Sequence, residues 1–172
     1  MANIKQIAFR EHEGSYLVGM IAAMKSKSGV IGFVGGMDIP LIRKFHGGYE
    51  QGAKSVNPNI TVLMNMTGTT GAAWNNPGRG AELTKGQIAK GADVVYHAAG
   101  TTGEGVLQAA ADNGILGIGV DKNQNHLHPG KVLTSMLKRV DVAVYNAFKT
   151  TMDGTYETGV FTLGLAEDGV GW

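Results

Sequence analysis

The chain has 172 residues, a length that suits one domain around a single core. Hydrophobic residues make up 43% and charged residues 17% of it, which excludes a disordered polypeptide. The formal net charge of +1 gives no electrostatic reason to expect binding to nucleic acid or to a membrane surface. There is no cysteine, which excludes disulfides, cysteine-ligated zinc and a cysteine nucleophile.

The first half of the chain alternates strand-like and helix-like segments. Apolar runs rich in β-branched residues or closed by glycines predict strands at 3–9, 29–36 and 59–66. Apolar residues at helical spacing predict helices, and these span 14–26, 39–56 and 80–91. A long polar loop is expected at 67–80, between the third strand and the third helix.

The second half repeats this order. Strands are expected at 92–99, 115–121 and 131–137, and a glycine-rich turn at 100–105. Helices are expected at 106–114 and 139–154, each ending at a glycine, followed by a β-rich tail at 159–172.

Strands joined by helices of this length predict an α/β fold in three layers, with a mostly parallel sheet between two layers of helices. Ligands of such sheets bind beyond the carboxyl ends of the strands. This rule selects four places in the sequence: "GGMD" at 35–38, the 67–80 loop, "AAGTTGEG" at 98–105 and "VDKNQ" at 120–124.

Catalytic and metal-binding patterns are weak. His126 and His128 resemble a metal-binding pair, but two loop histidines without cysteines or an acidic cluster are more typical of a solvated loop. Ser135 and Lys138 match S-x-x-K, yet the partner motifs of that nucleophile are absent and Ser135 lies in an expected strand. We therefore expect no enzyme activity, no cofactor and no metal.

Four residues are candidates for ligand binding. Trp74, in a polar loop, could pack on its own loop or stack on a flat ring. Gly100 opens a glycine-rich segment before a helix, which is either a plain turn or a source of backbone donors. Asp121 and Lys138 each end an expected strand, so they either bind a ligand's hydroxyl groups in one cleft or form a structural ion pair.

Four longer stretches of the sequence carry a resemblance to a known protein family. The segment 9–54 contains "FREHEGSYLVG" and "GFVGGMDIPLIRKF", and further matching segments lie at 91–124, 133–145 and 161–171. In order and wording these segments resemble the basic membrane protein family, and the likeness covers essentially the whole chain. The family includes purine nucleoside receptor lipoproteins, the substrate-binding components of ABC importers.

This resemblance implies a single lobe, residues 1–172, of the type I periplasmic-binding-protein fold. Family members are about twice as long and clamp the ligand between two such lobes; the chain resembles the second, and the first lobe has no counterpart in it. By motif position, Trp74 stands where the family has a stacking phenylalanine, and Asn76 replaces an aspartate. Gly100, Asp121 and Lys138 match the family's backbone contact and ribose-binding pair.

The resemblance implies that the chain binds a purine nucleoside or a similar small ligand and works with an ABC permease. It also implies a periplasmic or membrane-anchored location, although the printed sequence has no signal peptide and by itself would stay in the cytoplasm. A lone lobe would expose its cleft face, and this favours homo-oligomers. A cytosolic effector-binding or sensor lobe, and a non-functional truncated remnant, remain as alternatives.

Overall fold

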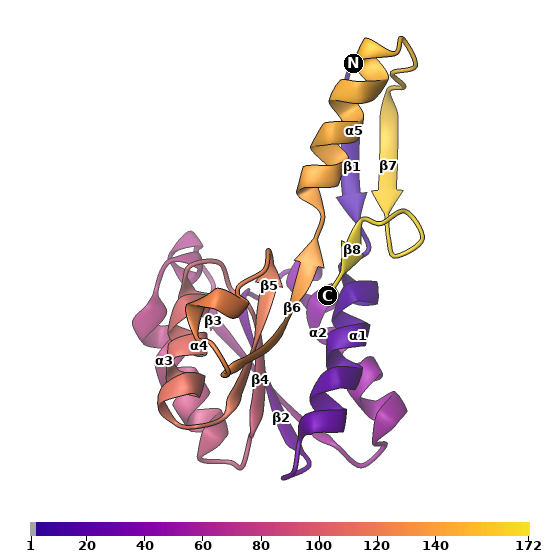
Figure 1. Cartoon of the computed structure of the whole chain (residues 1–172). Helices are drawn as coiled ribbons and strands as arrows, with labels where there is room; N and C mark the ends of the chain where they lie inside the picture. The colour runs from indigo at the N-terminus through magenta and orange to yellow at the C-terminus, as the bar shows by residue number, and fades with distance from the viewer. Residues whose placement is uncertain (1–2) are drawn as a thin grey trace.

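The structure of the protein is a computed structural model that describes residues 3–172. Its main body, the lobe, is a six-stranded sheet between two pairs of helices (Figure 1). The strand order is β3-β2-β4-β5-β6-β8, and all neighbours are parallel except β6 and β8. The predicted three-layer α/β class with a mostly parallel sheet is therefore confirmed.

Five parallel strands carry the lobe, and a short antiparallel strand closes one edge. They are β2 (Val30–Met37), β3 (Thr61–Gly68), β4 (Val94–Ala98), β5 (Leu116–Asp121), β6 (Val132–Lys138) and β8 (Val170–Gly171). The strand order reverses between β2 and β4, because β3 continues on one side of β2 and β4 pairs on the other. A site at the carboxyl ends of these strands is thus the expected place for a ligand.

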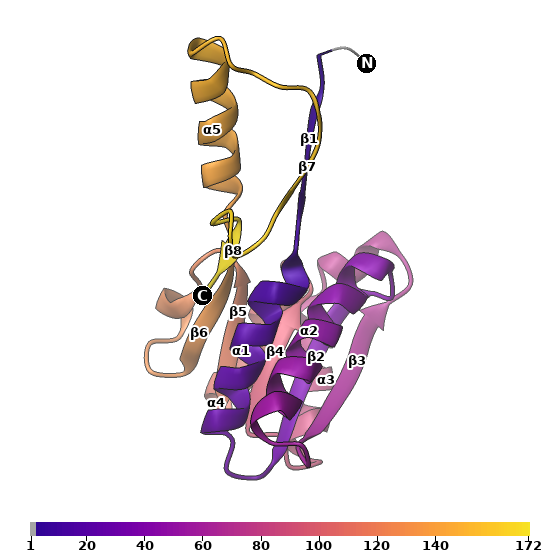
Figure 2. The same ribbon diagram turned by 90° about the vertical axis from the view of Figure 1, so that its right-hand side faces the viewer.

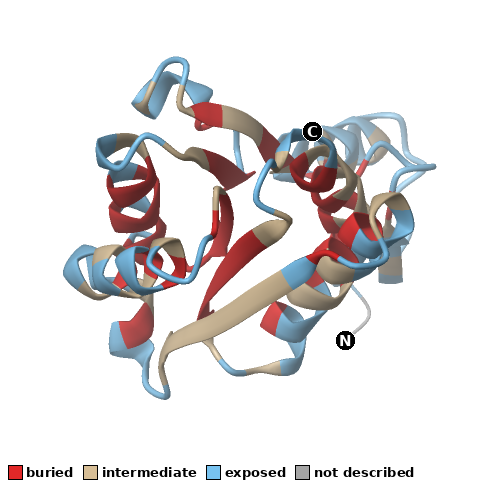
Figure 3. Ribbon diagram, turned by 90° about the horizontal axis from the view of Figure 1, so that it is seen from below, coloured by how far each residue is buried: buried red, intermediate tan, exposed pale blue. Residues whose placement is uncertain are grey.

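Four helices cover the sheet. They are α1 (Glu11–Lys25) and α2 (Pro40–Val56) on one face, with α3 (Pro77–Ile88) and α4 (Thr102–Asp112) on the other (Figures 1 and 2). Seen from below, the buried residues line the sheet and the inner sides of the helices (Figure 3). Helices α1 and α2 approach closely through glycines; a Cβ at Gly52, for example, would collide with the Tyr16 carbonyl.

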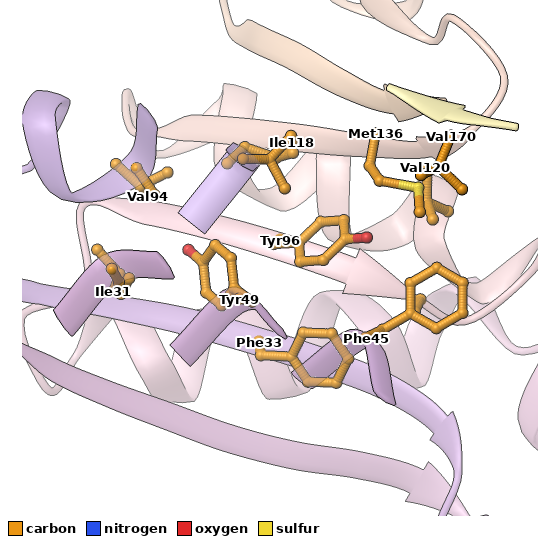
Figure 4. Close-up of a cluster of buried hydrophobic side chains, with 14 of the residues drawn as sticks. Ile31, Phe33, Phe45, Tyr49, Val94, Tyr96, Ile118, Val120, Met136 and Val170 are labelled. Carbon is orange, nitrogen blue, oxygen red and sulfur yellow. The ribbon is translucent and has the colours of Figure 1, made fainter. Parts of the chain in front are cut away.

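Aromatic rings fill the core beneath α1 and α2 (Figure 4). The rings of Phe33 and Tyr96 have centroids 5.6 Å apart and meet edge to face, and those of Tyr49 and Tyr96 are 5.1 Å apart. The Tyr96 hydroxyl lies 3.2 Å from the Ser15 hydroxyl, so this buried polar atom has a partner. The strands that carry the site residues are therefore anchored in a rigid core.

The first strand is not part of this sheet, contrary to the simple expectation for the segment 3–9. Strand β1 (Lys5–Phe9) pairs in parallel with β7 (Gly159–Leu163), and α5 (Val140–Met152) packs beside the pair. Together β1, α5 and β7 form an arm that rises from the lobe, with the N-terminus toward its far end (Figures 1 and 2). Within residues 3–172, none of the helices has the length and apolar character needed to cross a membrane.

Several helices begin earlier than the sequence indicated. Helix α1 starts at Glu11 rather than at residue 14, and the acidic Glu11 and Glu13 suit the positive end of its dipole. Helix α4 starts at Thr102, so most of the expected glycine-rich turn is helical. The expected 67–80 loop contains a 3₁₀ turn (Gly71–Trp74) and the first turn of α3.

Candidate ligand-binding site

Trp74, Gly100, Asp121 and Lys138 come from four separate segments, and the fold brings them together. All four line a pocket of about 170 Å³ at the carboxyl ends of the strands, which we name the Trp74 pocket. Its other walls are apolar side chains and backbone: Leu41, Ile42, Phe45, Ala98, Ala99 and Val120. The pocket thus combines an indole and an apolar wall with one carboxylate and one ammonium group.

A larger depression of about 570 Å³, the outer pocket, adjoins the Trp74 pocket. The two pockets share Gly100, Val120, Asp121 and Lys138. The outer pocket is otherwise lined mainly by polar and charged residues, among them Glu104, Lys122, Asn123, Gln124, Arg139 and Asp141. The two together suit a ligand with an apolar end and a hydrophilic end.

Trp74 is the last residue of the 3₁₀ turn, and neighbouring threonines hold that turn in place. The carbonyl of Ala73 accepts hydrogen bonds from Thr67 Oγ1 at 2.9 Å and from Thr102 Oγ1 at 2.7 Å. Asn76 then caps α3 by accepting a hydrogen bond from the Arg79 amide at 3.0 Å. An aspartate at this position could make the same cap, so the substitution noted at residue 76 preserves the local structure.

Gly100 lies between β4 and α4 with a φ of +59°, in the left-handed region that favours glycine. A Cβ there would lie 3.0 Å from the Trp74 carbonyl oxygen. Glycine therefore allows the β4–α4 turn to pass close to the loop that carries Trp74.

Asp121, the last residue of β5, also has a positive φ, of 66°. A buried network holds this conformation from both sides. Gln124 Oε1 accepts hydrogen bonds from the Val120 amide at 2.8 Å and from His97 Nε2 at 3.0 Å. The backbone amide of Gln124 in turn donates to Ser135 Oγ at 3.0 Å. The 120–125 turn is thus pinned to two strands.

This network assigns the proton on His97. Because a backbone amide can only donate, the Gln124 atom that it contacts is the carbonyl oxygen, and His97 Nε2 must carry a hydrogen. His97 is fully buried, and burial lowers its pKa to about 4, with the Gln124 contact opposing the shift. His97 is neutral at physiological pH and serves to hold the turn.

The charges in the site form a small cluster. Asp121 is exposed in the open pocket, yet protein groups surround it closely enough for lost hydration to raise its pKa; the Lys138 ammonium opposes this shift and Glu11 reinforces it. Lys138 Nζ lies 3.2 Å from Glu11 Oε1, and within residues 3–172 it forms its ion pair with Glu11 rather than with Asp121. The alternative that Asp121 and Lys138 only pair with each other does not describe this arrangement.

The other residues considered from the sequence lie elsewhere. His126 is exposed in a 3₁₀ turn and His128 is half-buried just after it, and no three histidine, aspartate or glutamate side chains within residues 3–172 could hold a metal ion together. Ser135 is buried and donates to Asn125 Oδ1 at 2.7 Å, which accounts for its hydroxyl. Asp38, from the "GGMD" segment, pairs with Arg43 in two contacts of 2.6 Å.

One wall of the Trp74 pocket was not predicted from the sequence; it is formed by Leu41, Ile42 and Phe45. Ile42 and Phe45 are only 3% exposed and follow the helical period of α2, so their pattern is that of ordinary core residues. Their position directly after a strand end at the switch point was the available signal. Glu11 was also missed, because a single acidic residue carries no recognisable pattern. Gln124 lies in the selected segment 120–124 but was given no role of its own.

The fold and the position of the site define one lobe of the solute-binding class of α/β proteins. A solved solute-binding protein of an ABC transporter from Aeropyrum pernix K1 superposes with a TM-score of 0.87 at 33% identity, covering 99% of this chain and 50% of that one. The sequence profile described as "ABC transporter substrate-binding protein PnrA-like" matches residues 1–172. The chain belongs to this family, named Bmp, as the motifs indicated.

Two relatives and a second solved structure are also similar to this chain along almost its whole length. Basic membrane protein D of Borreliella burgdorferi is 39% identical over 98% of this chain and 50% of its own length, and a lipoprotein of Pyrococcus abyssi is 39% identical over 99% and 44%. A transcriptional activator of the comK gene from Bacillus halodurans superposes with a TM-score of 0.88 at 25% identity, over 99% of this chain and 57% of that one. The chain thus spans about half the length of the relatives that it matches.

Proposed function

We propose that the chain is the second, ligand-binding lobe of a solute-binding protein for an ABC importer, and that its ligand is a purine nucleoside or a similar small molecule. One observation carries this proposal: Trp74, Gly100, Asp121 and Lys138 line a single pocket that joins an aromatic ring to two opposite charges. The family assignment supports the importer role, because the family consists of substrate-binding proteins rather than enzymes.

The chemistry of the pocket suits the two parts of a nucleoside. The base stacks on the indole of Trp74, against the apolar wall that includes Phe45. The Asp121 carboxylate accepts hydrogen bonds from sugar hydroxyls and the Lys138 ammonium donates to them. The turn at Gly100 brings the peptide backbone to the edge of the ligand.

The chain spans about half the length of its relatives, and the other half is expected to supply the rest of the binding site. We propose that a first lobe completes the cleft and that the arm of β1, α5 and β7 belongs structurally to that lobe. Closure of the two lobes on the ligand would then present both to the permease. The lipoprotein relatives support a location outside the cytoplasmic membrane, anchored to it or in the periplasm.

Calorimetric titration with adenosine, guanosine and inosine tests the proposal. We expect the isolated chain to bind in the millimolar range or more weakly, because half of the cleft contacts are missing, and each factor of ten corresponds to about 1.4 kcal/mol. Asp121→Ala should abolish the residual binding, whereas Asp153→Ala, an exposed residue at the end of α5, should leave it unchanged.

Two results would contradict parts of this proposal. Equal binding by the Asp121→Ala variant would remove Asp121 from the site. A submicromolar dissociation constant for the isolated chain would show that one lobe forms a complete site.

The similarity to the comK activator favours a second candidate, an effector-binding lobe of a cytosolic regulator. Cell fractionation separates the two, since a solute-binding protein is recovered with the membrane or periplasm and a regulator with the cytosol. A truncated remnant would bind no nucleoside, even when a matching first lobe is supplied.

A further inference from the structure

Glu11 lies beside the ligand site but is not one of the residues that line it. It is the first residue of α1, directly after the link at Arg10 to the arm, and only 3% of it is exposed. Its Oε1 lies 3.2 Å from Lys138 Nζ, and its Oε2 lies 3.9 Å from Lys44 Nζ. Oε2 has no hydrogen-bond partner among the described residues. A buried carboxylate in this position depends on the nearby ammonium groups.

Phe9 contacts the same lysine from the other side of the link. It is the last residue of β1, and Lys138 Nζ lies 5.2 Å from the centre of its ring. Lys138 ends β6, just before the chain continues into α5. The lysine is therefore held where two of the three connections between the lobe and the arm meet.

The two lysines around Glu11 differ in how firmly they are held. The Lys44 side chain is 51% exposed and lies at the limit of an ion pair, whereas the Lys138 side chain is 21% exposed and close. Exposed pairs of this kind contribute little, while a buried pair restricts both side chains. The contact with Glu11 restricts the Lys138 side chain before any ligand binds, and a side chain ordered in advance favours binding.

We propose that Glu11 is a positioning residue that, together with Phe9, fixes the Lys138 ammonium at the edge of the Trp74 pocket. An ammonium has three hydrogens, so the one directed to Glu11 leaves two for a ligand. Because Glu11 and Phe9 flank the link to the arm, the orientation of the arm also sets the position of this ammonium. The ligand-related part of this inference rests on the proposed function.

Side-chain NMR relaxation of the lysine Cε groups in the ligand-free chain tests the positioning directly. We expect the order parameter of Lys138 to exceed clearly that of Lys90, an exposed lysine, and to fall to the Lys90 level in Glu11→Gln. The replacement keeps the size of the side chain and removes its charge. Glu50→Gln, which breaks the exposed pair with Lys54 at 2.6 Å, should leave Lys138 unchanged.

Phe9→Leu provides a second variant, which should loosen Lys138 less because the ion pair remains. The inference is overturned if Lys138 is as mobile as Lys90 in the wild-type chain, or if Glu11→Gln leaves its order parameter unchanged. If Glu11 had only a structural role, Glu11→Gln would lower the stability of the protein without lowering the order parameter of Lys138.

A nucleoside titration in the same spectra tests the consequence for binding. Glu11→Gln should weaken the affinity about tenfold when Lys138 is present and have no effect in a Lys138→Met background. An equal loss in both backgrounds would contradict the positioning role. If the wild-type chain binds no nucleoside, the proposed function fails, while the relaxation result still decides the role of Glu11.

Discussion

The indole ring of Trp74 lies directly on Gly36, the penultimate residue of β2. A Cβ at Gly36 would lie 2.7 Å from Trp74 Cη2 and closer still to Cζ3 and Cε3. The absence of a side chain at Gly36 therefore allows the ring to lie against the sheet and form a wall of the pocket.

Gly36→Ala should displace the Trp74 ring and destabilise the protein. Inserting a methyl group into a close-packed contact costs about 1–3 kcal/mol in free energy of unfolding. Urea denaturation measures this cost, and tryptophan fluorescence reports the moved ring. As a control, Gly86→Ala adds a methyl to the exposed side of α3, where a Cβ meets nothing within 4 Å, and should stabilise the protein slightly. Unchanged stability and fluorescence in Gly36→Ala would show that the ring is free to move.

Stability should fall as the pH is lowered from about 6.5 to about 4. Burial lowers the pKa of His97 from its ordinary value to about 4, so in this window the unfolded chain binds a proton that the folded chain does not. The contribution of His97 to the free energy of unfolding is fully present above the pKa that this histidine has in the unfolded chain. Its loss across the window is about 3 kcal/mol. His46, whose pKa is also lowered by burial, acts in the same direction.

Chemical denaturation at pH 7 and pH 4.5 checks this dependence. His97→Gln, which can still donate to Gln124, should reduce the difference in stability between the two pH values. His126→Gln, at an exposed position, should not. An equal difference in all three proteins would mean that His97 is not the group responsible.

The arm should mediate self-association of the isolated chain. Its helix α5 packs Ala143 against β1 and leaves a row of large apolar side chains exposed: Val140, Val144, Tyr145, Phe148 and Met152. A double substitution Val144→Lys with Phe148→Lys should lower the mass measured by light scattering at high concentration. Met24→Lys, at a lone exposed methionine on α1, is the matched control. If the wild-type chain has the mass of a monomer, the prediction is wrong. If the mass stays above that of a monomer in both the double variant and the control, the contact lies elsewhere.

The exposed apolar side of α5 offers a second surface for self-association, in addition to the cleft face that the sequence analysis indicated. The sequence gives a helical apolar stripe at 139–154, which normally faces a core. In the folded chain, α5 instead lies outside the lobe and packs against the two strands β1 and β7, so part of its apolar stripe stays exposed. The cleft itself is lined in part by charged residues, whereas the exposed side of α5 is largely apolar.

The order of residues along the chain is enough to predict the alternation of strands and helices, the α/β class and the strand ends at Asp121 and Lys138. These are local properties, because apolar periodicity, glycine stops and strand-end polar residues are written within a few residues of one another. The family motifs favoured a ligand-binding role for the four candidate residues, and all four line one pocket.

The contact partners of these residues become known only from the folded chain. The pairing of β1 with β7 joins segments at opposite ends of the chain. The contact of Glu11 with Lys138 and the placement of Phe45 in the pocket wall likewise join distant residues. No local pattern encodes such contacts, because they depend on how helices and strands pack in three dimensions. His97 and Gln124 illustrate the same limit: the sequence places Gln124 in a candidate segment but does not pair it with His97, and their role follows from the hydrogen bond that joins them.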